Sequence, residues 1–438
     1  MVLPDARMVA TGALAAVVGV ALLAGLAMSS SAAPAAGEGT AGVVRVTDFG
    51  AVGDGETDCT AAFRRALQAV AHQDKGATVI VPPGRYKLTD SITVQRCLLT
   101  GLVAGGWPAD AGPMPELEIA HTKGPGIIAS DAASINGLTM NFQLERGEDG
   151  PKPSPPAILL AGNGISITNL RLHGAYDGII ADGKSNIGRL NIENVFMPAL
   201  YHCGVYVTRT YDIPTLRNIE VWVPHDWNIT HGGIGFRLGR NDCIRMSNCF
   251  AFKCAKGFVF DVDEGEGGGA TWGEMCECGT DACAEGIVVK APVYLNIHGG
   301  TYWDHFATLH VADPGAEVAF TGAMAQSNGA PAVLLEDCKQ VTIMGCQFRR
   351  AFENTKVFLV DVLSAAAVTI TGCIFSQDGP GVRVGEKVTS VLISDNIFRS
   401  APGPAIENQA PEGAVVLANN RIEQRREPQP QKRKENEE

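Results

Sequence analysis

The amino-acid sequence predicts an all-β protein, a single right-handed parallel β-helix with a short helix covering its N-terminal end. A pattern of one apolar residue, any residue, and then Gly, Asn or Asp recurs between residues 135 and 419. Apolar and polar residues alternate on both sides of this third position, which is typical of short β-strands. A second apolar strand, led by glycine, follows in most copies. Each copy is therefore expected to form one coil of about three short strands that stacks on the next coil.

The third position of the repeat marks the bend between two strands. Gly and Asn tolerate the left-handed backbone that a one-residue bend needs. Consecutive third positions are 22 to 32 residues apart, and one copy has a glutamate there. They are Gly137, Asn169, Asn194, Asn218, Asn248, Glu277, Gly299, Gly322, Gly345, Gly372, Asp395 and Asn419.

Two other architectures fit the sequence less well than the β-helix. A β-sandwich made of hairpins would show two-residue Asn-Gly turns and no fixed period. A leucine-rich repeat has a similar period but needs its own Leu/Asn signature, which this sequence lacks. The period and the bend residues therefore favour the β-helix.

The N-terminal residues 1–35 have the features of an export signal. Arg7 precedes the uncharged apolar run Val9–Met28, and a stretch of small residues that fits a cleavage site follows. The run is long for a signal peptide, so an uncleaved membrane anchor is the alternative. After this signal peptide or anchor we expect a β-helix at 43–424 and a disordered charged tail at 425–438.

An open end of a β-helix must be covered, and residues 58–73 can form the covering helix. Asp58 is a good N-cap, and the apolar residues that follow fall on one helical face. A strand at 78–81 comes next, and the proline-rich turn at 82–86 ends it.

These residues carry a family resemblance. Asp48-Phe-Gly-Ala-Val-Gly-Asp-Gly-Glu-Thr-Asp58, the helix, and Val79-Ile-Val-Pro-Pro-Gly-Arg-Tyr86 resemble the opening of the pectate-lyase-like β-helix superfamily. The resemblance is to the branch with rhamnogalacturonase and epimerase-like domains. It implies the fold but not the activity, because hydrolases, lyases, epimerases and binding proteins share the motif.

Composition narrows the partners and the role of the cysteines. A net charge of −12, without a basic stripe that contains aromatic residues, argues against nucleic-acid binding. Of the twelve cysteines, Cys249, Cys278, Cys346 and Cys373 follow a third position directly. We expect Cys249, Cys346 and Cys373 to point into the core as free thiols.

Polar residues between the second and third strands of each coil should share one edge of the stack. The catalytic candidates there are Asp177, His202, His231 and Lys256, and the substrate-binding candidates are Tyr201, His225, Asp226, Trp227, Trp303, Asp304 and His305. Solvated turn residues are the alternative explanation, because the turns of a solenoid face water. The coincidence of histidines, carboxylates and tryptophans favours a ligand groove.

The resemblance to polygalacturonases is incomplete at this edge. Those enzymes hold an Asn-Thr-Asp, an Asp-Asp, a Gly-His-Gly and an Arg-Ile-Lys on successive coils. Tyr176-Asp177-Gly178 resembles the first and Thr230-His231-Gly232 the third, but Tyr201-His202-Cys203 lacks both acids of the second. Inverting hydrolysis needs two carboxylates with room for a water, so this departure weakens that mechanism.

Two other chemistries remain open. Elimination needs a base and a positive charge, which His202, His231 and Lys256 could supply. The epimerase branch uses a Tyr/His/Asp cluster, and Tyr201, His202 and Asp177 match its chemistry but not its local motif.

The sequence thus predicts a secreted, periplasmic or cell-envelope protein that acts on a polysaccharide containing uronic acids, by glycosidic hydrolysis or β-elimination. A non-catalytic polysaccharide-binding or structural envelope β-helix is the alternative, so enzymatic activity stays open. An enzyme of this kind would be a polysaccharide lyase or a polygalacturonase- or rhamnogalacturonase-like hydrolase. No cofactor or metal is expected, apart from calcium in the case of a lyase. No nucleic-acid partner is expected, and no membrane span unless the N-terminal segment stays uncleaved.

Overall fold

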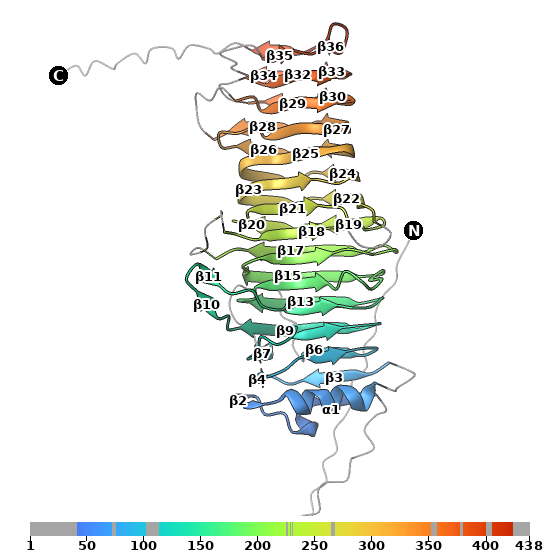
Figure 1. Ribbon diagram of the computed structural model, residues 1–438, viewed down its shortest axis with the longest axis vertical. Coiled ribbons are helices and arrows are strands. Elements are labelled where there is room, and N and C mark those ends of the chain that lie inside the picture. The colour runs from blue at the N-terminus through green and yellow to red at the C-terminus, as the bar shows by residue number, and fades with distance from the viewer. Residues whose placement is uncertain are drawn as a thin grey trace, which may run out of the picture. The chain divides into compact units, whose positions relative to one another are not determined.

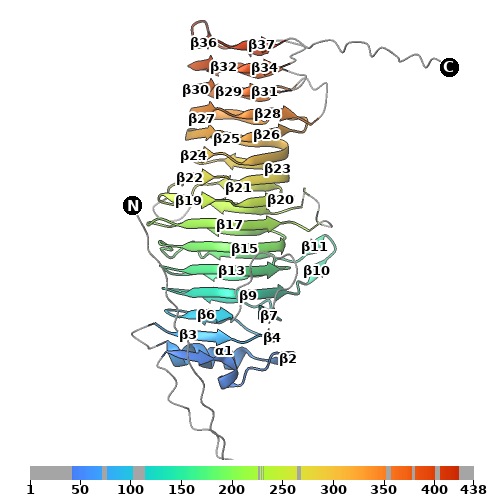
Figure 2. The same ribbon diagram turned by 180° about the vertical axis from the view of Figure 1, so that it is seen from behind.

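The computed structural model describes residues 42–71, 76–101, 114–224, 227, 229, 231–263, 268–351, 357–376, 380–399 and 405–423. These residues form stacked coils whose strands pair in parallel with the coils before and after (Figure 1, Figure 2). The predicted right-handed parallel β-helix is therefore confirmed. In this part of the chain, no helix is long and apolar enough to cross a membrane.

The strands form three parallel ladders, which we call A, B and C in the order in which each coil passes through them. Ladder A contains the strands that precede the bend of the repeat: β1 (Val43–Arg45), β3 (Thr78–Val81), β6 (Leu98–Gly101), β19 (Ile244–Ser247), β22 (Trp272–Cys276), β24 (Tyr294–His298), β30 (Ala367–Thr371), β33 (Val391–Ser394) and β36 (Val415–Ala418).

Ladder B follows the bend. It contains β2 (Asp54–Asp58), β4 (Arg85–Leu88), β7 (Glu116–Ile119), β20 (Phe250–Phe252), β26 (Met324–Ser327), β28 (Gln347–Arg350), β31 (Ile374–Phe375), β34 (Ile397–Arg399) and β37 (Arg421–Glu423).

Ladder C consists mainly of the glycine-led strands. It contains β5 (Ile92–Val94), β8 (Ile127–Ala129), β12 (Ile158–Leu160), β14 (Asp177–Ala181), β16 (Cys203–Val207), β18 (Ile234–Leu238), β21 (Lys256–Phe260), β29 (Val360–Ala365), β32 (Val382–Val388) and β35 (Ile406–Asn408).

Longer strands continue from one ladder into the next. From A to B run β9 (Ser134–Phe142), β13 (Ser166–His173), β15 (Asn191–Ala199) and β17 (Thr215–Trp222); β23 (Gly279–Val289) runs from B to C, β25 (Thr301–Thr321) from B through C to A, and β27 (Val333–Met344) from C to A.

The bend between ladders A and B is held by the third position of the repeat. Asn169, Asn194, Asn218 and Asn248 all have left-handed backbone, with φ between 50° and 55°. Their side chains bond from coil to coil: Asn194 Nδ2 donates to Asn169 Oδ1 (3.1 Å), Asn218 to Asn194 (2.7 Å) and Asn248 to Asn218 (2.9 Å). Asparagine thus adopts the left-handed backbone that the bend needs and also forms the hydrogen bond that joins one coil to the next.

The cysteines that follow this bend line the core. All twelve cysteines of the chain are free thiols in the structure. Of those that follow the bend, Cys249, Cys346 and Cys373 are buried. Their predicted place in the core is confirmed, and a small, weakly polar side chain fits a column of stacked apolar residues.

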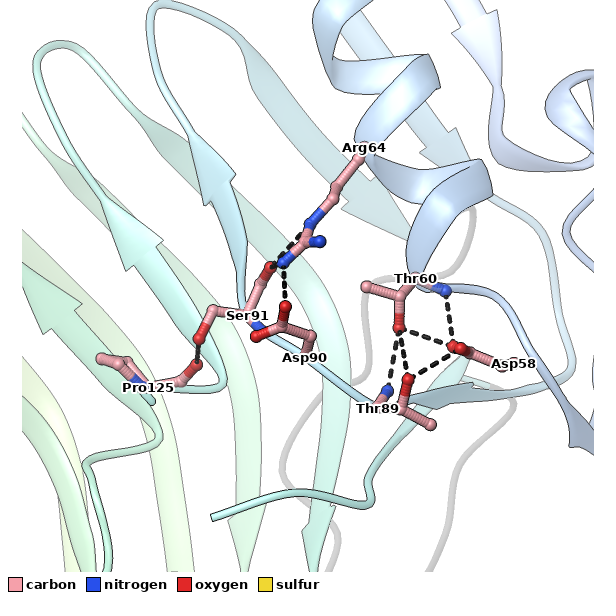
Figure 3. Close-up of polar contacts among 7 residues, drawn as sticks. All are labelled: Asp58, Thr60, Arg64, Thr89, Asp90, Ser91 and Pro125. Atoms are coloured by element: carbon pink, nitrogen blue, oxygen red, sulfur yellow. Dashed lines mark hydrogen bonds and ion pairs between the residues drawn. The ribbon is translucent and has the colours of Figure 1, made fainter. Parts of the chain in front are cut away.

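The N-terminal end is covered by the 3-10 helix η1 (Val46–Phe49) and by α1 (Thr60–Val70). The predicted helix was longer, at 58–73. Asp58 lies just outside the helix because its carboxylate accepts bonds from Thr60 N (3.0 Å), Thr60 Oγ1 (2.6 Å) and Thr89 Oγ1 (2.7 Å), as Figure 3 shows. The hydroxyl of Thr60 contributes most to lowering the pKa of Asp58 to about 2.

The same network ties α1 to the first coils. Arg64 Nη2 donates to the carbonyl of Ser91 (2.6 Å) and lies 2.8 Å from the carboxylate of Asp90, while Ser91 Oγ donates to the carbonyl of Pro125 (2.6 Å; Figure 3). Asp58 of the family motif and Arg64 of the helix thus hold α1 over the open end.

Residues 142–156 project from the wall (Figure 1) and contain two short antiparallel strands, β10 (Arg146–Gly147) and β11 (Gly150–Pro151). Lys152 Nζ lies 3.1 Å from the carboxylate of Glu145 across the base of this hairpin. The four prolines of the segment did not prevent the pairing, because only a two-residue register is needed.

Candidate functional site

The turn between ladders B and C brings Asp177 and His202 together. Asp177 begins β14 and pairs with Cys203, the first residue of β16 on the next coil. His202 Nδ1 lies 2.7 Å from Asp177 Oδ1, and the same oxygen accepts a bond from the backbone N–H of Cys203 (3.1 Å). The imidazole is exposed, whereas the carboxylate is mostly covered. The carboxylate therefore supports a histidine that faces solvent.

Electrostatics at this pair favour the protonated histidine. The hydrogen bond with Asp177 raises the pKa of His202, while burial and the charge of Arg237 oppose this to a smaller extent. The ring of Tyr176 stacks on the imidazole, with centroids 5.2 Å apart and planes 20° from parallel. Burial, together with the charge of Asp177, raises the pKa of Tyr176, so its phenol stays protonated near neutral pH.

An aromatic cluster continues from this pair along the stack. The ring of Trp227 lies edge-on to Tyr201 (5.6 Å) and tilted against His231 (5.4 Å). The hairpin reaches over this cluster: Arg146 Nη2 lies 3.4 Å from the Tyr201 hydroxyl. At Gly150, where φ is 123°, a Cβ atom would lie 1.9 Å from the Trp227 ring. Only glycine permits this approach, so Trp227 is packed between its neighbours and does not form an open platform.

Positive charges lie beyond the pair on the outer face of ladder C. Arg237 on β18 is held by Asp261 (Nε to Oδ2, 2.9 Å) and its guanidinium lies 5.0 Å from the centre of the Tyr206 ring. Lys256 begins β21 and is partly buried; burial and the neighbouring Lys290 lower its pKa. It pairs with Ile234 on one side and Glu285 on the other.

Among the predicted site residues, Asp177 contacts His202, and Tyr201, Trp227 and His231 form the adjoining cluster. In ladder C, residue 177 pairs with 203, 203 with 234, and 234 with 256. Each pairing advances one coil, so Lys256 lies three coils from Asp177. Three steps of ~4.8 Å place it roughly 14 Å away along the axis. His225 and Asp226 lie outside the described residues.

Trp303, Asp304 and His305 do not belong to this cluster. Lys256 pairs with Glu285 on the next coil, and Glu285 pairs with Ala307 on the coil after that. Trp303, Asp304 and His305 therefore lie about five coils from Asp177. Trp303 and His305 are exposed, but Asp304 points inward and is 1% exposed. The sequence had suggested that all three lie on an exposed turn. In the structure they belong to the continuous strand β25, where alternate residues point inward and outward.

Sequence reasoning missed Tyr206 and Arg237. The predicted site residues lie in the turns between strands, whereas Tyr206 and Arg237 lie within strands β16 and β18. A signal was available: both occupy the third place of a glycine-led segment, Gly204-Val-Tyr and Gly235-Phe-Arg, and they pair with each other in ladder C. Polar residues at this outward position mark the face beside the turn.

Among the described residues, no group of three or more His, Cys, Asp or Glu side chains is placed to hold a metal ion. The acidic stretch 261–269 falls partly outside the described residues. Within the part of the chain that the structure describes, the calcium that a lyase would use therefore has no fitting set of ligands at the Asp177–His202 pair.

Comparisons with known proteins agree with this architecture. The family model "Rhamnogalacturonase A/epimerase, pectate lyase-like" matches residues 43–104, which include α1 and the first coils. The curated mannuronan C5-epimerase AlgE1 of Azotobacter vinelandii is 33% identical over 159 residues, 34% of this chain and 10% of that protein. A second, AlgE3 of the same organism, is 27% identical over 159 residues, 34% of this chain and 8% of that protein. The chain thus spans a tenth or less of the length of these relatives.

Among solved structures, the pre-mature bacteriophage phi29 gene product 12 is similar in fold. The match has a TM-score of 0.59 at 15% identity and covers 86% of this chain and 57% of that one. The match of residues 43–104 to this family model and the parallel β-helix fold agree with the resemblance of the N-terminal motif to the pectate-lyase-like superfamily.

Proposed function

We propose that this protein acts on a polysaccharide that contains uronic acids, and that it removes the proton at C5 of a uronosyl residue. The observation that carries the proposal is the Asp177–His202 pair, 2.7 Å apart on the outer wall, with a tyrosine stacked on the imidazole. Loss of the C5 proton can be followed by β-elimination of the C4 substituent or by reprotonation from the other side, which is epimerisation.

The residues present suit this chemistry. The C5 proton is adjacent to a carboxylate, so its removal needs a base and a positive charge that stabilises the resulting enolate-like anion. Nδ1 of His202 is engaged by Asp177, which leaves Nε2 for proton transfer. Arg237, fixed by Asp261, provides a permanent charge close enough to affect the pKa of His202. Tyr176 and Tyr201 offer phenol groups as proton donors.

The comparisons support the same class of substrate. The curated relatives are mannuronan C5-epimerases, whose name states a reaction at this carbon. Hydrolysis is less well supported, because an inverting glycosidase needs a second carboxylate and Asp304 is buried in the core. For a protein that meets such polymers, we propose a secreted or cell-envelope location.

The test is an assay of the purified protein on a panel of uronic-acid and neutral polysaccharides. Unsaturated, ultraviolet-absorbing ends indicate elimination, and uptake of solvent deuterium at C5 without chain cleavage indicates epimerisation. New reducing ends without unsaturated product would mean hydrolysis and would contradict the C5 mechanism. Binding without any product would favour a non-catalytic polysaccharide-binding protein.

Variants should separate the site from the rest of the surface. Asp177→Asn and His231→Ala are each expected to lower turnover by about a hundredfold without affecting folding, as loss of a group that assists proton transfer does. His298→Ala is the matched control, because His298 is an exposed histidine on ladder A, away from the turn between ladders B and C, and its ring bonds to Thr321 (2.8 Å). Full activity in the Asp177/His231 double variant would refute the assignment.

The pH profile tests the role of His202. A base must be unprotonated, and Asp177 raises the pKa of His202. Turnover should therefore rise with pH through a midpoint above the ordinary value for histidine. In Asp177→Asn, the midpoint of the residual activity should move down. A midpoint that is unchanged by this substitution would show that His202 is not the titrating base.

A further inference from the structure

The last coil of the described residues leaves its inner side chains uncovered. One inward column runs through Ile393 to Leu417, and another through Phe398 to Ile422. Ile393 and Phe398 are 0% and 1% exposed, whereas Leu417 and Ile422 are 52% and 58% exposed. The apolar core of the stack is thus open at this end.

The two ends of the stack differ in this respect. At the N-terminal end α1 lies across the first coils (Figure 1), and its apolar face is buried against them. At the other end, β36 and β37 pair with β33 and β34 on one edge only, among the residues that the structure describes. An uncovered strand edge with an apolar face beside it favours pairing with another chain.

We propose that this end binds a second copy of the same chain, end to end, about a two-fold axis. In this dimer β37 lies antiparallel to the second copy's β37, with the two Ile422 side chains opposite each other. Leu417 and Ile422 of both copies then close one continuous core. A two-fold arrangement is self-complementary, so it uses the same surface of each copy and cannot extend into a fibre.

The charges of β37 fit this pairing. Antiparallel strands centred on residue 422 place residue 421 of one copy opposite residue 423 of the other. Arg421 and Glu423 carry opposite charges, lie on either side of Ile422 and pair with each other within the chain (Nε to Oε1, 3.3 Å). In the dimer each of them also lies directly opposite the opposite charge of the second copy, a favourable arrangement for residues on neighbouring strands.

The segment that follows the last coil is a poorer occupant. Residues 424–438 contain only Gln, Arg, Glu, Pro, Lys and Asn. Proline aside, such a segment has no apolar side chain to place over Leu417 and Ile422. A second copy supplies those side chains in matching number and position.

Light scattering and sedimentation equilibrium of the full chain test the proposal. A concentration-dependent dimer is expected, and Ile422→Asp should weaken it at least tenfold. Leu392→Asp is the matched control, since Leu392 is an exposed apolar residue on the outward face of the preceding coil and should change nothing. Arg421→Glu should also weaken the dimer, and adding Glu423→Arg should restore it, because the reversed pair is again complementary.

Disulfide cross-linking tests directly whether the two Ile422 positions lie opposite each other. Ile422→Cys should yield a covalent dimer under mild oxidation with oxidised glutathione, with peptide mapping showing a 422–422 link, whereas Leu392→Cys should not. A protein that is monomeric at all concentrations would overturn the proposal. So would a dimer that survives Ile422→Asp, or a monomer that dimerises only after residues 424–438 are removed, since the tail would then be the occupant.

Discussion

A carboxyl group lies inside the core of the β-helix at Asp304. Its Oδ2 accepts bonds from the hydroxyls of Thr280 (2.8 Å) and Thr308 (3.2 Å). Burial nevertheless raises the pKa of Asp304 to about 7, because two hydroxyl groups replace only part of the lost hydration. A carboxyl group in an unfolded chain titrates near pH 3.9.

This difference sets the direction of a stability change with pH. Below pH ~4 the group is protonated in both states and has no effect on the pH dependence. As the pH rises towards 7, the unfolded chain releases its proton while the folded chain keeps it, so the free energy of unfolding falls. Above pH ~7 the ionised Asp304 lowers the free energy of unfolding by its full amount, about 4 kcal/mol for a shift of this size.

Asp304→Asn should therefore raise the melting temperature at pH 8 and leave it almost unchanged at pH 4. The amide keeps an acceptor for the two threonine hydroxyls but cannot ionise. Glu412→Gln, on an exposed turn, serves as the control for removing a negative charge. Equal effects of Asp304→Asn at both pH values would show that Asp304 does not carry a raised pKa.

Asp304 and Arg237 also show where residue-level prediction from this sequence stops. The turn-based search found Asp177 and His202 because they are neighbours at equivalent places of successive coils. Arg237 does not stand out in this pattern, because it lies at an outward position within a strand and not in a turn. The same pattern misplaced Asp304 because a shift of one residue along a strand exchanges the inward and outward faces.

At the scale of the element, the asparagine ladder links each bend to the next. Asn194 has φ 54° and bonds to Asn169 in the coil before and to Asn218 in the coil after. Two separate contributions are thus combined in one side chain: tolerance of left-handed backbone and a hydrogen bond on each side.

Two substitutions should separate these contributions. Asn194→Ala loses the bonds and forces alanine into left-handed backbone, which costs about 1–2 kcal/mol beyond the lost bonds. Asn194→Gly loses the bonds but keeps the backbone unstrained. The glycine variant should therefore melt above the alanine variant, and both below the parent, by calorimetry. Equal melting temperatures for the two variants would mean that the backbone of this bend is not strained by a side chain.

The same ladder explains why the fold could be predicted well at this scale. Left-handed bends need particular residue types, so their spacing is written directly in the sequence. Helix and hairpin details were less accessible, since Asp58 could equally be the N-cap or, as found, precede it while bonding Thr60. The hairpin of β10 and β11 packs at Gly150 against Trp227, a residue distant in the sequence, and local patterns do not contain such a contact.

For the whole molecule, stability rests on contacts between adjacent coils, so the treatment of the two ends matters most. The N-terminal end has α1, fastened through Asp58 and Arg64 to the first coils. The other end has exposed apolar side chains, which a second copy can cover. The unequal ends are consistent with a stack that is closed by its own helix on one side and by association on the other.

This view predicts the effect of removing the tail. Truncation after Gln424 should leave both the melting temperature and the dimer unchanged, because residues 425–438 lack apolar side chains and add nothing to the core. Scanning calorimetry and light scattering of the truncated and full chains provide the comparison, with Ile422→Asp as the variant that does disturb this end. A drop of several degrees on truncation would show that the tail covers Leu417 and Ile422, and the end would then be closed within one chain.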